Sequence, residues 1–177
     1  MTLPIRVVPV GIVDRDFVDT VVALLAREYR VPCTLDRQQV DPAFAFHSER
    51  SQYHSTTLLE NLVQSARDSR ILGVTGVDLY IPILTFVFGE AQLDGRCAIV
   101  SYHRLDQEFY GLPPDRALTR DRLAKESVHE IGHTYGLTHC DDYECAMAAA
   151  HSVEWIDVKG GALCDSCRAR VFLGSHS

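Results

Sequence analysis

The stretch HEIGHTYGLTH, residues 129–139, restricts the fold more than any other part of the chain. His129 and His133 are four residues apart, and this spacing brings two side chains to one face of a helix, one turn apart. Both imidazoles can therefore bind the same metal ion. Gly136 can adopt the left-handed conformation that closes many helices, so His139 can return as a third ligand. The stretch predicts a helix that ends near Gly136 and is followed by a turn.

Glu130 lies beside the first histidine and is not at ligand spacing with the pair. A glutamate in this position can reach a metal-bound water and take its proton. Three protein ligands leave the fourth position for water, which is typical of a catalytic zinc site. A single histidine is usually an ordinary core or surface residue. The full pattern is expected by chance in only roughly five of a hundred thousand chains of this composition, if positions are independent.

A second possible metal site follows the histidines. Its candidate ligands are Cys140, Cys145, Cys164 and Cys167. Their C-x4-C and C-x2-C spacings suit a closed, tetrahedral zinc site, which would contribute folding energy to a segment that has little core of its own. Two disulfides and a redox CxxC are the alternatives, and the lack of a secretory signal at the start disfavours disulfides. Cys33 and Cys97 lie in apolar runs, so we expect them to be buried thiols.

Charge and length exclude several classes of function. The chain has 177 residues and a net charge of −7, which argues against a nucleic-acid-binding or anionic-membrane surface because both need a basic face. It contains no run of about eighteen apolar residues that could span a membrane. We therefore expect a soluble, cytoplasmic protein, acting as a monomer without nucleic-acid or membrane partners.

The hydrophobic periodicity predicts an α/β fold in which strands and helices alternate, and this alternation favours a mostly parallel sheet. The expected elements are a strand at 5–11, a helix at 15–29 capped by Asp14, a short strand at 33–36, a helix at 54–68, a strand and turn at 71–80, a hairpin-like pair within 85–105, the histidine helix beginning at an N-cap at Thr119, and a last helix at 165–173. We expect an N-terminal part, residues 1–136, with the sheet, two packing helices and the active-site helix. A small irregular part, residues 137–177, would hold the cysteines.

The order of these residues resembles the archaemetzincin family of the metzincin clan of zinc peptidases. HEIGHTYGLTH is followed by Cys140, then by Met147, and then by CDSC at 164–167. The resemblance implies a metzincin-like twisted sheet, a methionine turn at Met147, and two zinc ions per chain, one catalytic and one structural. The loop between Met147 and Cys164 has sixteen residues, one fewer than the family pattern, which would not move the ligands out of reach.

The predicted reaction is hydrolysis of a peptide bond in a peptide or protein substrate. The zinc would lower the pKa of its water, and Glu130 would serve as general base and then as proton donor to the leaving amine. We expect the substrate cleft to run along the 129–136 helix, and residues 84–88 or 97–102 to pair with an extended peptide. The acidic residues of the 141–144 loop, Asp141, Asp142 and Glu144, could attract a free amine and favour aminopeptidase action, although a solvated acidic loop also explains them.

Two other classes of function remain at this stage. The chain could be a zinc-stabilised peptide-binding module with little hydrolysis, but a pure binding site has no need of a base such as Glu130. It could also be a redox or metal-buffering protein that uses the cysteines. His139 and Cys140 are neighbours in the sequence, so we expect the histidine metal site and the cysteine metal site to be coupled. A Cys164→Ser variant should therefore weaken metal binding by the histidines.

Overall fold

The computed structural model describes residues 2–173 and contains a twisted five-stranded sheet. In spatial order its strands are β2 (Cys33–Leu35), β1 (Ile5–Val10), β5 (Arg70–Thr75), β8 (Cys97–Ser101) and β7 (Gly89–Ala91). The first four are parallel, and β7 pairs antiparallel with β8 at the edge of the sheet. The mostly parallel sheet and the hairpin-like pair within 85–105 are therefore confirmed.

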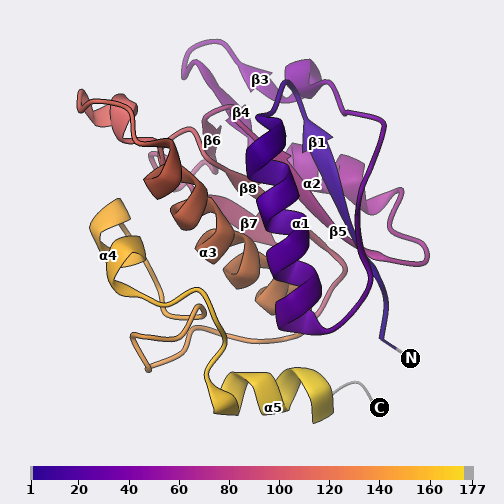
Figure 1. Cartoon of the computed structure of the whole chain (residues 1–177). Coiled ribbons are helices and arrows are strands. Elements are labelled where there is room, and N and C mark those ends of the chain that lie inside the picture. The colour runs from indigo at the N-terminus through magenta and orange to yellow at the C-terminus, as the bar shows by residue number, and fades with distance from the viewer. Residues whose placement is uncertain (1, 174–177) are drawn as a thin grey trace.

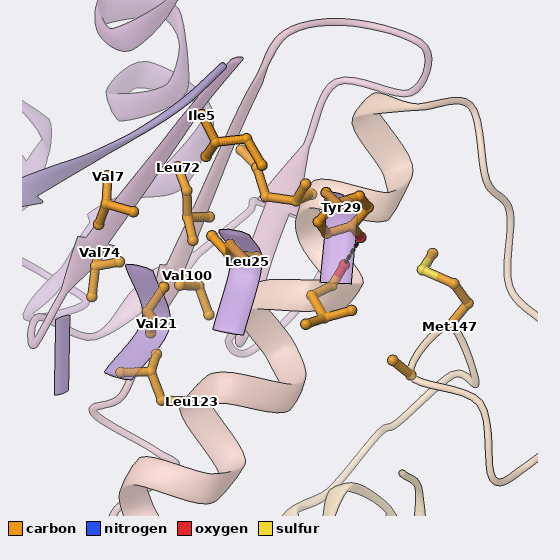
Figure 2. Packing of buried hydrophobic residues seen from close by; sticks show 14 of the residues in the cluster. Ile5, Val7, Val21, Leu25, Tyr29, Leu72, Val74, Val100, Leu123 and Met147 are labelled. Carbon is orange, nitrogen blue, oxygen red and sulfur yellow. Dashed lines mark hydrogen bonds between the residues drawn. The ribbon is translucent and has the colours of Figure 1, made fainter. Parts of the chain in front are cut away.

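Three helices cover the two faces of this sheet. Helices α1 (Arg15–Tyr29) and α3 (Arg116–Thr134) pack on one face, and α2 (Ser55–Val63) covers the other (Figure 1). Along β1, β5 and β8 the buried residues alternate between the two faces, as the period of two in a strand requires. Figure 2 shows the core under α1 and α3, which includes Ile5, Val7, Val21, Leu25, Leu72, Val74, Val100 and Leu123.

The remaining elements are short. They are η1 (Pro42–Ala45), β3 (Phe46–His47), β4 (Gln52–His54), β6 (Leu79–Tyr80), η2 (Gln107–Tyr110), α4 (Val153–Val158) and α5 (Asp165–Leu173). Strands β3, β4 and β6 form a second small sheet. The predicted 54–68 helix ends already at Val63, the predicted 71–80 segment splits into β5 and β6, and α4 was not predicted.

The start of α3 corrects the predicted N-cap. The cap is Asp115, whose carboxylate accepts a hydrogen bond from the backbone N–H of Leu118 at 3.0 Å. Thr119 lies inside the first turn and is fully buried, and its hydroxyl donates to the carbonyl of Asp115 at 3.0 Å. An aspartate and a threonine are both good N-caps, so residue preference alone did not separate them.

The end of α3 follows the prediction. Gly136 has φ +80°, a left-handed conformation that a residue with a Cβ adopts only with strain. Its N–H donates to the carbonyl of His133 at 2.9 Å, and the N–H of Leu137 donates to Gly132 at 3.2 Å. This pair of bonds is the Schellman turn. The turn satisfies the last carbonyls of the helix and reverses the chain next to His133.

The segment after Gly136 packs against the same core as the sheet. Met147, Ile156 and Val171 belong to the hydrophobic cluster under α1 and α3. The buried guanidinium of Arg122 on α3 binds both carboxylate oxygens of Asp157, each at 2.7 Å, and so ties α4 to α3. The division of the chain at residue 136 stays a prediction.

Within residues 2–173, no helix combines the length and apolar character needed to cross a membrane.

Candidate metal centre

The three histidines of the motif meet at one point. His129 and His133 lie one turn apart on α3, with ring centroids 4.6 Å apart, and the ring of His139 lies 5.3 Å from each. One ring nitrogen from each residue falls within 4.8 Å of the others, a separation that a single metal ion can bridge. The Nε2 atoms of His129 and His133 are 3.1 Å apart. The turn at Gly136 therefore brings together the set that the spacing predicted.

Two backbone carbonyls orient the rings on α3. Nδ1 of His129 lies 2.9 Å from the carbonyl of Ala146, and Nδ1 of His133 lies 2.7 Å from the carbonyl of Leu137. A carbonyl can only accept, so each Nδ1 carries the proton and each Nε2 keeps its lone pair. Such carbonyl contacts are typical of metal-binding histidines. The Schellman turn thus supplies both the reversal of the chain and the group that orients His133.

The local electrostatics keep these histidines neutral. Burial lowers the pKa of His129 well below its usual value, and the charge of Lys159 lowers it further. Burial is also the main reason why the pKa values of His133 and His139 are lowered. A metal ligand must have a free lone pair, so the neutral imidazole is the form that binds. The triad is therefore in its ligand form at neutral pH.

Glu130 lies in the same cleft, against the edge strand. It is 6% exposed, and burial raises its pKa well above the usual value, with the nearby charges of Glu126 and Glu90 adding to the effect. A Cβ built on Gly89 would come within 2.7 Å of Oε1 of Glu130 and within 2.6 Å of the carbonyl of Ile99. The missing side chain at Gly89 is therefore what leaves room for the glutamate beside the histidines.

Met147 packs under the histidine helix. It is fully buried, and its sulfur and methyl group lie where a side chain on Gly132 would be. Figure 2 shows Met147 at the margin of the core, next to α3. The backbone carbonyl of Met147 accepts a hydrogen bond from the N–H of Cys140 at 2.9 Å. The methionine turn is thus tied to the residue that follows His139.

The four cysteines converge as the second cluster. One sulfur from each of Cys140, Cys145, Cys164 and Cys167 lies within 4.8 Å of the others. Sγ atoms of Cys140 and Cys164 are 3.8 Å apart, and none of the cysteines forms a disulfide. The N–H of Cys167 lowers the pKa of the Cys164 thiol, while burial raises that of Cys145. Four converging sulfurs match the donor set of a closed tetrahedral site.

The cleft beside the histidines has a volume of about 750 Å³. Its walls are largely apolar, and the lining residues include Leu84, Phe86, Phe88, Ala91, Leu93, Ala149 and Ala150. Residues 84–88 line it, as predicted for one candidate peptide-binding segment. Residues 97–102 do not, because β8 lies between β5 and β7 inside the sheet. None of Asp141, Asp142 and Glu144 lines the cleft, and the Asp142 carboxylate instead accepts from the N–H of Glu144.

Sequence reasoning missed two residues of this site. Lys159 and Glu126 form a buried ion pair, with Nζ and Oε1 2.7 Å apart. Glu126 lies one turn before His129 on α3 and lines the cleft. Burial raises its pKa, and Lys159 opposes that rise. Glu126 could have been predicted from its position, because it lies four residues before Glu130 and so on the same helix face. No feature of the sequence around Lys159 indicates that it belongs to the site.

Comparison with known proteins identifies the family. A family model described as Peptidase family M54 matches residues 11–172. An archaemetzincin of Methanocaldococcus jannaschii is 43% identical over 126 residues, which make up 71% of this chain and 69% of that protein.

Two solved structures are similar over nearly the whole chain. One is a zinc-dependent peptidase from Methanocorpusculum labreanum, with a TM-score of 0.87 at 31% identity, covering 94% of this chain and 99% of that one. The other is an archaemetzincin from Archaeoglobus fulgidus in complex with malonate, with a TM-score of 0.83 at 33% identity, covering 95% and 99%. The chain therefore belongs to Peptidase family M54, the archaemetzincins, and is a zinc metallopeptidase.

Proposed function

We propose that His129, His133 and His139 hold the catalytic zinc and that Glu130 is the general base of peptide-bond hydrolysis. The observation that carries the proposal is the donor set itself. Both α3 histidines have Nδ1 on a carbonyl, so their Nε2 lone pairs are free to bind a metal ion beside Glu130. Zinc bound here would polarise the substrate carbonyl and lower the pKa of its water.

Glu130 has the position and the environment of an acid–base group. No side chain in residues 2–173 forms a hydrogen bond or ion pair with its carboxylate, which leaves both oxygens for water and substrate. Burial raises its pKa, and a cation held by the histidines would oppose that rise. Because its oxygens are free beside the histidines, the carboxylate can take the proton of the attacking water and pass it to the leaving amine.

The edge strand offers main-chain groups to an extended peptide. The N–H of Ser101 donates to Phe88, and the N–H of Gln92 donates to Cys97, so these pairs form the hydrogen-bonded rungs between β7 and β8. In an antiparallel pair of strands, residue pairs that are hydrogen-bonded to each other alternate with pairs that are not. Gly89 and Ala91 belong to the pairs that are not. Gly89 and Ala91 therefore direct their N–H and C=O groups away from β8, toward the open edge that borders the cleft. A substrate strand can pair with them by β-augmentation.

The cleft favours an apolar substrate segment. Its lining includes Leu84, Phe86, Leu93, Ala149 and Ala150, and an apolar lining with few polar groups selects apolar side chains. The acidic loop of residues 141–144 lies outside this lining, so it lends no support to a preference for a free amine. Aminopeptidase action stays a prediction, which a comparison of free and N-acetylated peptides would test.

We further propose that Cys140, Cys145, Cys164 and Cys167 hold a second, structural zinc, which gives two ions per chain. The four sulfurs converge and leave no position for water or substrate. The ion would join the loop after His139 to the start of α5. Its contribution would be to folding, because residues 137–173 contain two short helices and no strand.

A Glu130→Gln variant tests the proposed reaction. The amide keeps the shape of the side chain but cannot take a proton, so we expect hydrolysis of a peptide library to fall by about 10²–10⁴-fold with zinc content unchanged. Glu60→Gln, an exposed glutamate on α2, is the control and should behave as the wild type. Full activity of the Glu130→Gln variant would exclude Glu130 as the base. Binding of peptides by the wild type without hydrolysis would instead favour the binding-module alternative.

A further inference from the structure

Lys159 occupies an unusual position for a lysine. It is one of only two lysines in the chain, it follows α4 directly, and its side chain is 1% exposed. Burying an ammonium group costs several kcal/mol unless it is well paired. Lysine is therefore rarely found at such a position unless its charge or its hydrogen bonds have a use.

Three oxygens lie close to this ammonium group. Nζ lies 2.7 Å from Oε1 of Glu126, 3.0 Å from the carbonyl of Ala146 and 3.1 Å from the carbonyl of Ala148. Nδ1 of His129 is also close, at 3.3 Å. That nitrogen already donates its proton to Ala146, so it is no acceptor for the lysine. Nζ therefore hydrogen-bonds to the two carbonyls, and its ion pair with Glu126 balances the buried charge.

Two of these oxygens belong to the turn that supports the histidine centre. Ala146 and Ala148 flank Met147 on both sides. The carbonyl of Ala146 has two lone pairs, and it accepts from Lys159 with one and from His129 with the other. The third oxygen belongs to Glu126, one turn before His129 on α3. Lys159 therefore connects the methionine turn, the ring of His129 and the helix that carries it.

We infer that Lys159 is a positioning residue for the histidine metal centre, holding the carbonyl that sets the ring orientation of His129. The inference rests on the proposed zinc site and adds to it a group that never touches the metal. The ligand concerned is a divalent cation of the zinc class. Loss of such an outer group typically weakens metal binding by about 10–100-fold.

A purely structural role makes a different prediction. If the lysine and Glu126 only neutralise each other, removing both charges together should restore the protein, because a buried ion pair can often be replaced by uncharged residues of similar volume without loss. If the lysine positions Ala146 and through it His129, removing both should restore stability but not metal affinity. The double variant Lys159→Met with Glu126→Gln therefore separates the two roles.

Cobalt(II) titration of the full-length protein reads the two metal sites separately. Thiolate sites show intense sulfur-to-metal charge-transfer bands in the near ultraviolet, and a three-histidine site does not. The variants are Lys159→Met, Glu126→Gln and the double variant. Lys125→Met is the matched control, because Lys125 also joins α3 to α4, with Nζ 3.2 Å from the carbonyl of Ile156, but does not reach the methionine turn.

We expect the cobalt affinity of the histidine site to fall about 10–100-fold in Lys159→Met and in the double variant, while the thiolate bands titrate as in the wild type. Lys125→Met should leave both sites unchanged. Wild-type affinity in the double variant would overturn the inference, and this test holds even if the single lysine variant fails to fold. A wild-type protein with thiolate bands but no histidine-site spectrum would instead refute the proposed function itself.

Discussion

A Gly89→Ala substitution should displace the proposed base without touching the metal ligands. The new Cβ would lie 2.6 Å from the Ile99 carbonyl and 2.7 Å from Oε1 of Glu130, whereas ordinary contacts begin at 3.4 Å. The carbonyl belongs to β8, which is paired on both sides by β5 and β7, so it cannot give way easily. The edge strand must therefore move by about 0.8 Å to clear the carbonyl, the difference between 3.4 and 2.6 Å, and the distance to Oε1 of Glu130 must grow by about 0.7 Å, the difference between 3.4 and 2.7 Å.

A displacement approaching 1 Å in a catalytic group can cost about 10²-fold in rate, which corresponds to roughly 2.7 kcal/mol in the activation barrier. We therefore expect kcat/KM of Gly89→Ala on a cleaved peptide to fall on the order of 10²-fold, mainly through kcat, with zinc content unchanged. Overpacking should also lower the free energy of unfolding by about 1–3 kcal/mol.

Gly161→Ala is the control for this experiment. A Cβ at Gly161 would meet only Cγ of Lys125, at 3.7 Å, so activity should stay at the wild-type level. Steady-state kinetics, elemental analysis for zinc and urea denaturation together separate lost catalysis from lost metal or lost fold. A Gly89→Ala variant with wild-type kcat would show that the position of Glu130 does not depend on the space at this glycine.

Three further predictions follow from the site. With the histidine centre emptied of metal, Glu130 has a raised pKa, so its contribution to stability is fully present below its ordinary value of about 4.5 and is lost as pH rises. Glu130→Gln should then gain stability over the wild type between pH 4 and pH 8, by at most about 1.4 kcal/mol per pH unit; an equal difference at both values in urea denaturation would contradict this. Met147→Leu should cost less than about 1.5 kcal/mol in unfolding free energy, and Met147→Ala about 2–5 kcal/mol; equal losses would argue against a packing role. Cys164→Ser should weaken cobalt binding by the histidines, because Cys140 is bonded to the methionine turn; histidine-site affinity equal to that of a Cys33→Ser control would refute the coupling.

The parts of the site that could be predicted from the sequence are those set by short-range geometry. The four-residue spacing of His129 and His133 fixes their common face on any helix, and Gly136 marks the turn that returns His139. The two pairs of cysteines have the spacing of a known type of zinc site. In each case the relevant contacts lie close together along the chain, so the residue types and their spacing were sufficient.

The parts that could not be predicted depend on contacts between distant segments. Lys159 precedes two glycines and looks like a residue of an exposed loop, and its burial depends on how α4 packs against α3. The role of Glu126 depends on its ion pair with that lysine, which the sequence does not indicate. The order of β7 and β8 in the sheet decides which strand borders the cleft, and local patterns carry no information about this order. The cap at Asp115 was missed because Thr119 has a similar preference for the position.

Zinc per chain, measured by elemental analysis on protein purified without chelator, tests the central claim most directly. The wild type should contain two ions, and His133→Ala should contain one, because only the histidine centre is lost. A wild-type protein with a single ion that survives His133→Ala but is lost in Cys145→Ser would contradict a zinc centre at the histidines.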